Sequence, residues 1–156
     1  MTLPLQLAFA TIMVTLTIGL HLAGLTVLLR LLRGHRSRRP DGNVHLHDSI
    51  GILIAAFALF VLHAIEIWGY AVLYFTAGAL RTFEEALYFS TSTYATIGYG
   101  DVVLAPGWRV LGAIEGANGI ILLGWSTAFF VAVVTRIRLL ELEIDAEPAA
   151  PMREIP

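Results

Sequence analysis

Three long runs of apolar residues dominate the chain, and shorter polar segments separate them. The runs cover about residues 7–32, 50–76 and 108–135, and a histidine interrupts the first one. Each run exceeds the roughly 20 residues that a helix needs to cross the hydrocarbon core of a membrane. The pattern therefore predicts an all-α membrane protein with three spanning helices per chain.

Residues 82–95 lie between the second and third runs and are too few and too polar to span a membrane. Thr82, with Glu85 three positions later, has the form of a capping box, which marks the first turn of a helix. We expect about three helical turns that enter the membrane and end inside it. Non-helical backbone at that depth is tolerated only where protein buries it or where it lines water. The loop that follows this helix is therefore a candidate pore lining.

The composition supports a membrane protein and excludes several other classes. Hydrophobic residues make up 57 % of the chain and charged residues only 14 %, compared with about 25 % charged in a typical soluble domain. The absence of cysteine excludes disulfides, iron–sulfur clusters and thiolate zinc sites. The one basic cluster is short and lies beside a membrane segment, so we expect no nucleic-acid binding. No nucleophile–base pair is evident, so we do not expect an enzyme.

The arginines set the expected orientation of the chain. Arginine supplies all ten basic side chains, and most of them follow the first and third apolar runs, at Arg30, Arg33, Arg36, Arg38, Arg39, Arg136 and Arg138. By the positive-inside rule these segments face the cytoplasm. The N-terminus and the segment 78–107 are then outside, and the C-terminus is cytoplasmic. We expect an integral protein of a bacterial inner membrane, surrounded by lipids.

The loop after the short helix has the sequence T-I-G-Y-G-D at residues 96–101. An ion that leaves water needs oxygen ligands in place of its hydration shell, and glycines at alternate positions let the backbone turn successive carbonyls inward. Placed between a half-length helix and a spanning helix, this motif resembles the selectivity filter of the tetrameric potassium channels. The resemblance covers about residues 50–138, and isoleucine stands where valine is commonest in that family.

The resemblance implies a homotetramer in which each chain supplies one quarter of a carbonyl ring, with K⁺ as the bound ion and no other cofactor. Asp101 would attract cations at the outer mouth, and Gly98 and Gly100 would supply the unusual backbone dihedrals. Ile97 and Tyr99 would point away from the ions and pack behind the filter. The expected ion-binding residues are Thr96, Ile97, Gly98, Tyr99 and Gly100, with K⁺ at the carbonyls of the first four.

By position in the same resemblance, the third run is the inner helix of the pore. Gly119 and Gly124 are candidate hinges, although glycines also serve close helix packing in membranes, and both interpretations stay open. An apolar ring near the cytoplasmic end can gate by dewetting. The expected cavity and gate residues are Ile120, Leu123, Thr127, Val131, Val134 and Thr135.

The support of the filter departs from that of the best-known members of the family. Tyr88 and Phe89 replace a tryptophan pair, and Ser92 stands where some members carry a carboxylate. Phe89 cannot donate a hydrogen bond to Tyr99, and Ser92 cannot form a carboxyl pair with Asp101. We therefore expect a filter that is braced differently.

Ionisable groups inside spanning segments are costly and are therefore candidates for function. His63 and Glu66 are three residues apart, as are Glu115 and Asn118, so each pair is expected to share one face of its helix. Two interpretations remain open: a proton-sensitive switch that couples helix position to the filter, or an interhelical hydrogen-bond network that fixes packing. His21 is alone on the first run and is expected to make a polar contact between helices.

The expected division of the chain places the pore between an additional helix and a short tail. His45, His47 and Asp48, before the second run, alternate as metal ligands often do, and the sequence leaves metal binding there open. Residues 136–144 are expected to continue as a short helix. The segments are an N-terminal helix at 1–33, a cytoplasmic loop at 34–49, a pore domain at 50–138 (outer helix 50–77, pore helix 82–95, filter 96–101, inner helix 108–135) and a cytoplasmic tail at 139–156.

These features predict a potassium-selective channel that conducts K⁺ passively through the filter at residues 96–100. Two alternatives remain, a nonselective cation channel and a non-conducting regulatory subunit. No voltage sensor and no cytoplasmic ligand-binding domain is expected, so the sequence leaves open the gating stimulus, any gating ligand and the role of the first helix.

Overall fold

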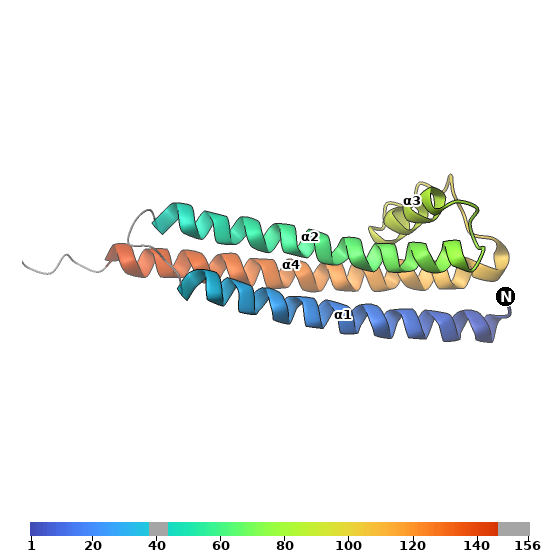
Figure 1. The fold of residues 1–156 in the computed structure, drawn as a ribbon, viewed down its shortest axis with the longest axis horizontal. Coiled ribbons are helices and arrows are strands. Elements are labelled where there is room, and N and C mark those ends of the chain that lie inside the picture. Colours follow the sequence, from blue (N-terminus) through green and yellow to red (C-terminus); the bar gives the residue numbers. More distant parts are fainter. Residues whose placement is uncertain (38–43, 147–156) are drawn as a thin grey trace, which may run out of the picture.

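The computed structural model of the chain describes residues 1–37 and 44–146. Three long helices lie alongside one another, and a short helix lies near one end of them (Figure 1). The N-terminus is at the same end as the short helix. The long helices are α1 (Leu3–Ser37), α2 (Val44–Thr76) and α4 (Arg109–Ala146), the short one is α3 (Phe83–Tyr94), and a 3₁₀ turn, η1 (Pro106–Trp108), leads into α4.

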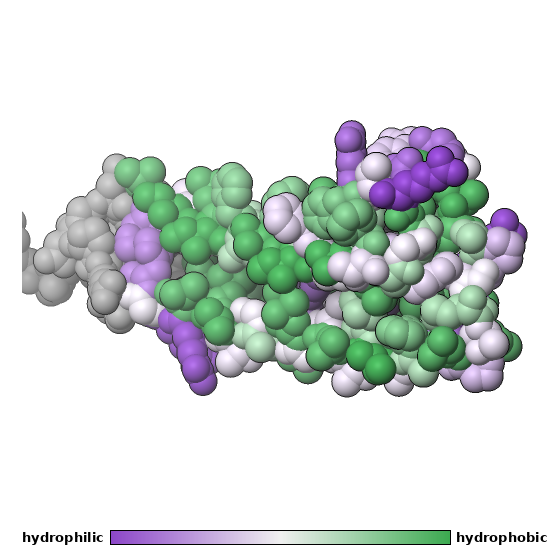
Figure 2. Space-filling model, turned by 45° about the vertical axis from the view of Figure 1, so that its right-hand side comes forward, coloured by the Kyte–Doolittle hydropathy of each residue, from purple (hydrophilic) through white to green (hydrophobic). Residues whose placement is uncertain are grey.

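The long helices have the length and composition of membrane spans. The three candidate spans are Leu3–His35, Leu46–Thr76 and Pro106–Leu139. Large apolar side chains cover their outer faces, and Phe57 and Phe60 of α2 are 70 % and 74 % exposed in the single chain. Figure 2 shows the hydrophilic residues mostly towards the two ends of the molecule and hydrophobic residues between them. This distribution suits a surface in contact with lipid.

The helices extend beyond the apolar runs that predicted them. The expected loop at 34–49 is largely helical, because α1 continues to Ser37 and α2 already begins at Val44. The inner helix continues past residue 135, so α4 includes the first part of the expected tail and ends at Ala146. Arginine, leucine and glutamate are good helix formers in water as well, so the apolar runs mark the span and not the helix. Residues 147–156 of the expected tail lie outside the described residues.

One seam of α1 packs against α2 and α4 of the same chain. Its most buried positions are spaced alternately by four and seven residues, which is the 3.5-residue period of helices that pack at a small crossing angle. Gly24 lies on the same seam, and a side chain there would collide with Leu62 of α2. The buried positions are Gln6, Ala10, Thr17, His21 and Leu28.

The start of α3 is fixed by the residues that predicted it. The Thr82 hydroxyl accepts a hydrogen bond from the Glu85 backbone N–H at 3.1 Å. The Glu85 carboxylate accepts the backbone N–H of Arg81 at 3.2 Å, whereas in a strict capping box it would bind the N–H of Thr82. Two donors at this helix end are thereby satisfied. The helix begins at Phe83 and ends at Tyr94, one residue inside each predicted limit.

Candidate pore loop and the polar network behind it

The pore loop is held against the last turn of α3. The backbone N–H groups of Ile97 and Gly98 both donate to the Ser92 carbonyl, at 2.8 and 3.1 Å. The N–H of Thr96 donates to the Thr93 carbonyl at 3.0 Å. These bonds end the helix and turn the chain back, so the loop starts directly at the carbonyl end of α3. That end carries the partial negative charge of the helix dipole.

Three residues of the loop have left-handed backbone dihedrals, at alternate positions. The φ angles are +58° at Thr96, +60° at Gly98 and +80° at Gly100. Glycine adopts this conformation freely, and the two glycines behave as the sequence predicted. Thr96 was not predicted to do so, because an L-residue with a side chain pays about 1–2 kcal/mol for it. Alternation of residues with positive and negative φ turns successive carbonyls towards one side.

Tyr88 of α3 braces the outer end of the loop. Its hydroxyl donates to Asp101 Oδ2 at 2.8 Å, and its ring stacks on that of Tyr99 with 6.4 Å between centroids. The hydrogen bond from Tyr88 holds the pKa of the Asp101 carboxyl below its ordinary value. The same bond raises the pKa of Tyr88. Phe89, the next residue, packs edge-to-face on Tyr74 instead, with 5.4 Å between centroids.

The predicted cavity and gate residues lie along one stripe of α4. Ile120 and Val131 are 57 % and 58 % exposed in the single chain. Thr127 is also exposed, and its hydroxyl donates to the Leu123 carbonyl at 2.9 Å. Leu123 and Val134 are half-buried. This stripe is therefore available to a cavity or to another chain.

The two candidate hinge glycines have different surroundings. A Cβ at Gly119 would collide with the Tyr94 carbonyl oxygen and lie 2.9 Å from Cγ of the Tyr94 ring, whereas Gly124 has nothing within 4 Å. Helix α4 continues unbroken through both positions. Gly119 therefore allows α4 to approach the end of α3 closely, which is the packing role. Gly116 and Gly112 extend this contact towards Thr93 and Phe89, and sequence reasoning did not single them out.

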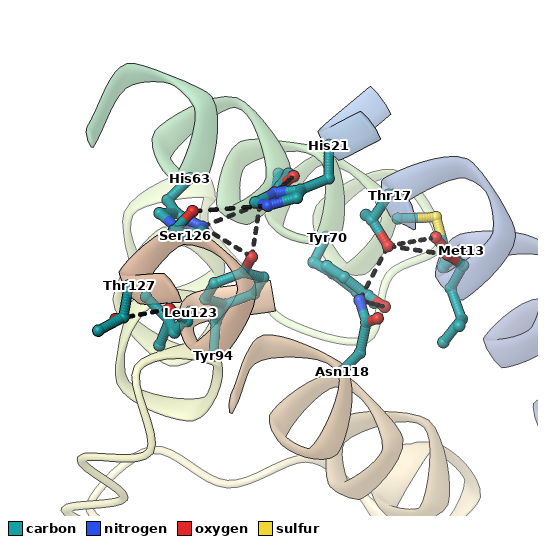
Figure 3. A network of polar contacts seen from close by, with 12 residues as sticks. Met13, Thr17, His21, His63, Tyr70, Tyr94, Asn118, Leu123, Ser126 and Thr127 are labelled. Carbon is teal, nitrogen blue, oxygen red and sulfur yellow. Dashed lines mark hydrogen bonds and ion pairs between the residues drawn. The ribbon is translucent and has the colours of Figure 1, made fainter. Parts of the chain in front are cut away.

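A buried polar network links the long helices to the last residue of α3 (Figure 3). Glu66 is at its centre and is fully buried. One carboxylate oxygen lies 2.9 Å from His21 Nδ1, and the other lies 3.0 Å from His63 Nδ1. The Tyr94 hydroxyl donates to the second oxygen at 2.5 Å. His63 Nε2 lies 2.8 Å from Ser126 Oγ of α4.

The network confirms two predictions and joins them. His63 and Glu66 are in contact, as their spacing predicted. His21 makes the predicted contact between helices, and its partner is that same Glu66. The sequence did not indicate that the three side chains would meet, because His21 is 45 residues away from Glu66.

Glu115 and Asn118 do not form the expected pair, because each binds other partners. Glu115 is fully buried and accepts hydrogen bonds from the Tyr74 hydroxyl at 2.7 Å and the Ser90 hydroxyl at 2.5 Å. It thereby ties α4 to α2 and α3. The Asn118 amide nitrogen donates to Thr17 Oγ1 of α1 at 2.8 Å and to the Tyr70 hydroxyl of α2 at 3.3 Å.

The histidines near the other end of the bundle form a stack. The rings of His35 and His47 are parallel, with 3.8 Å between centroids, and each Nε2 lies near the backbone carbonyl of the other residue, at 3.2 and 3.1 Å. His47 and Asp48 line a cavity of about 510 Å³ between the ends of the long helices. The side chain of His45 lies outside the described part of the chain. Among described side chains, His21, His63 and Glu66 form the group of three close metal ligands, and His47 and Asp48 are not in it.

Residues 50–136, more than half of the chain, match the Ion_trans_2 family, described as an ion channel. The chain belongs to this family of ion channels, which are not enzymes, and with three candidate spans it is an integral membrane protein. The match contains α3, the pore loop and most of α2 and α4, and α1 precedes it. No curated protein and no solved structure shows a significant match to the chain.

Proposed function

We propose that this ion channel is selective for K⁺ and that four copies of the chain surround one pore. The observation that carries the proposal is the T-I-G-Y-G loop at the carbonyl end of α3, with left-handed dihedrals at Thr96, Gly98 and Gly100. This backbone can direct a row of carbonyls towards one axis, where four copies would replace the hydration shell of K⁺. The Thr96 hydroxyl would close the innermost site.

Charge and exposure support the same proposal. The carbonyl end of α3 favours a cation beside Thr96. The hydrogen bond from Tyr88 lowers the pKa of Asp101 and so favours its charged form at the outer mouth. Ile97 and Tyr99 are 51 % and 70 % exposed in the single chain, so neighbouring chains can cover them. We place the pore loop and the N-terminus on the outer side of the membrane, because the arginine-rich end of the bundle is opposite.

The test is the reversal potential of the purified chain in liposomes under opposed K⁺ and Na⁺ gradients. We expect a potential near that of K⁺. A potential near zero with measurable current would favour the nonselective cation channel. No current over a range of pH would favour a non-conducting subunit, and a mass other than that of four chains would contradict the tetramer.

A pair of glycines offers a matched control for the filter. Gly98 and Gly78 both have positive φ, at +60° and +70°, and a Cβ added at either position would have no neighbouring atom within 4 Å. Gly98→Ala and Gly78→Ala therefore impose similar backbone strain, of about 1–2 kcal/mol. Only Gly98→Ala is expected to lower the selectivity for K⁺ over Na⁺. Equal effects of the two substitutions would contradict a filter at Gly98.

The sequence leaves the gating stimulus open, and a proton-sensitive switch is one of its two interpretations of the buried ionisable groups. For a proton-sensitive switch, the cleanest variant is Glu115→Gln, because Glu115 binds α2 and α3 and the amide keeps the shape of the carboxyl group. A flux–pH curve of Glu115→Gln that superimposes on that of the unchanged chain would exclude this carboxyl as the sensor.

A further inference from the structure

We propose that His21, His63 and Glu66 form a binding site for a first-row transition-metal dication, with Zn²⁺ as the best match. The ligand atoms of the three side chains all lie within 4.8 Å of one another. Two imidazoles and a carboxylate are a donor set that Zn²⁺ takes in proteins. The site does not depend on which ion the pore conducts.

The distances between the ligand atoms suit a metal of this size. Zn²⁺ binds imidazole nitrogen and carboxylate oxygen at about 2.0–2.2 Å, so neighbouring ligands of a tetrahedral site lie about 3.3 Å apart. Glu66 Oε1 and Oε2 lie 2.9 and 3.0 Å from Nδ1 of His21 and His63. Each histidine nitrogen therefore already lies near this separation from a carboxylate oxygen, and a metal would draw the three ligand atoms, which lie within 4.8 Å of one another, closer together.

The second nitrogens of the two histidines share one partner. Nε2 of His63 lies 2.8 Å from Ser126 Oγ, and Nε2 of His21 lies 3.5 Å from the same oxygen. Both rings thus present Nδ1 to Glu66 and Nε2 to α4. A metal-binding histidine needs such an outer partner, which fixes the tautomer and the orientation of the ring. Ser126 is therefore a positioning residue for both ligands.

Tyr94 supplies the fourth ligand. Its hydroxyl lies 2.5 Å from Glu66 Oε2 and 3.0 Å from His63 Nδ1. If metal binding released the hydroxyl proton of Tyr94 to water, the resulting phenolate and the Glu66 carboxylate would together balance the two charges of the metal. This balance matters because a net charge at this depth in a membrane is costly. The side chain of His63 is 12 % exposed, whereas those of His21 and Glu66 are 0 % exposed. The metal would therefore enter the site at His63.

A bound metal would act at the base of the filter. Tyr94 is the last residue of α3, and Thr96 begins the pore loop two residues later. The metal would join α1, α2 and the end of α3, and so would restrict the movement of α3 relative to α1. We therefore expect the site to regulate conduction and not to carry the conducted ion.

The experiment is a titration of the purified chain with Co²⁺ in detergent at constant pH, followed by visible absorption. Co²⁺ takes the geometry of a Zn²⁺ site, and its absorption reports that geometry directly. We expect the spectrum of four-coordinate Co²⁺ to saturate at one ion per chain and Zn²⁺ to displace it. A chain that shows no such spectrum overturns the proposal, whatever its variants do and whatever the reversal potential shows.

Four variants test the assignment of residues. His21→Gln and His63→Gln are expected to weaken Co²⁺ binding by at least about 100-fold, and Ser126→Ala by about 10–100-fold. His47→Gln is the matched control, because it removes a histidine from the stack at the other end of the bundle, and it is expected to bind as before. Circular dichroism and oligomeric mass show which variants are folded. If neither histidine variant folds, the Co²⁺ affinity of Ser126→Ala decides the test. Co²⁺ affinity that is unchanged in the folded His21→Gln or Ser126→Ala chain overturns the site.

Discussion

Replacement of Gly119 by alanine is expected to push the inner helix away from the pore helix. The added methyl group would collide with the Tyr94 carbonyl oxygen and lie 2.9 Å from both the carbonyl carbon and Cγ of Tyr94. Carbon atoms pack at about 3.5–4.0 Å, so the two helices must separate by about 0.6–1.1 Å or the end of α3 must deform. The obstacle is backbone at the base of the filter, and it cannot rotate away as a side chain would.

The magnitude follows from two opposing contributions. Overpacking of a well-packed site destabilises the fold by about 1–3 kcal/mol. Replacement of glycine by alanine inside a helix stabilises the helix by about 1 kcal/mol. We expect Gly119→Ala to lower the free energy of unfolding by about 0–2 kcal/mol and to reduce K⁺ flux, because Tyr94 adjoins the pore loop.

Gly124→Ala is the matched control, because nothing lies within 4 Å of a Cβ at that position. It gains helix propensity without a collision and is expected to be neutral or to stabilise by up to about 1 kcal/mol. Unfolding of the two variants in detergent, followed by tryptophan fluorescence, measures the difference, and flux in liposomes accompanies it. A Gly119→Ala chain as stable as Gly124→Ala, but with altered opening, would refute the packing role and favour the hinge.

Three substitutions and one deletion test contacts elsewhere in the chain. Tyr88→Phe removes the donor that lowers the pKa of Asp101, so this pKa rises towards its ordinary value. The loss of flux on external acidification should then move to higher pH, and an unchanged or lower midpoint would contradict this. Thr17→Val and Asn118→Ala should be coupled in a double-mutant cycle by about 0.6 kcal/mol, with about 1.7 as the upper limit; additive effects on unfolding would show that the contact contributes nothing. Deletion of residues 1–33 should prevent stable assembly, which oligomeric mass measures, and a deleted chain of unchanged mass and flux would give α1 a minor role.

Features that depend on neighbouring residues could be predicted from the sequence. The three spans follow from the length of the apolar runs, and the start of α3 follows from Thr82 and Glu85. The glycines of the pore loop follow from the backbone freedom that only glycine has. Thr96 escaped this reasoning because its left-handed conformation is imposed from outside, by the hydrogen bonds that fix the loop on the last turn of α3.

Contacts that depend on the rotation of one helix against another could not be predicted. Glu115 and Asn118 are three residues apart, which leaves about 60° between them around the helix. That angle is small enough to suggest a pair. It is also large enough to direct Glu115 to Ser90 of α3 and Asn118 to Thr17 of α1. The contact between His21 and Glu66 could not be predicted for the same reason, because it depends on the rotation of α1 relative to α2.

The polar residues of α1 indicate that this helix belongs to the support of the pore. The Gln6 side chain accepts the backbone N–H of Val110 at 3.2 Å, in the first turn of α4, where helix donors have no partner within the helix. Thr17 binds the middle of α4, and His21 binds Glu66 of α2. A helix that only anchored the chain would gain nothing from polar groups on its inner face, since each costs free energy in the membrane unless it is paired. In α1 each of these three is paired, and each partner belongs to α2 or α4, the helices against which α3 packs. A movement of α1 must therefore be transmitted to the helices that hold the pore loop.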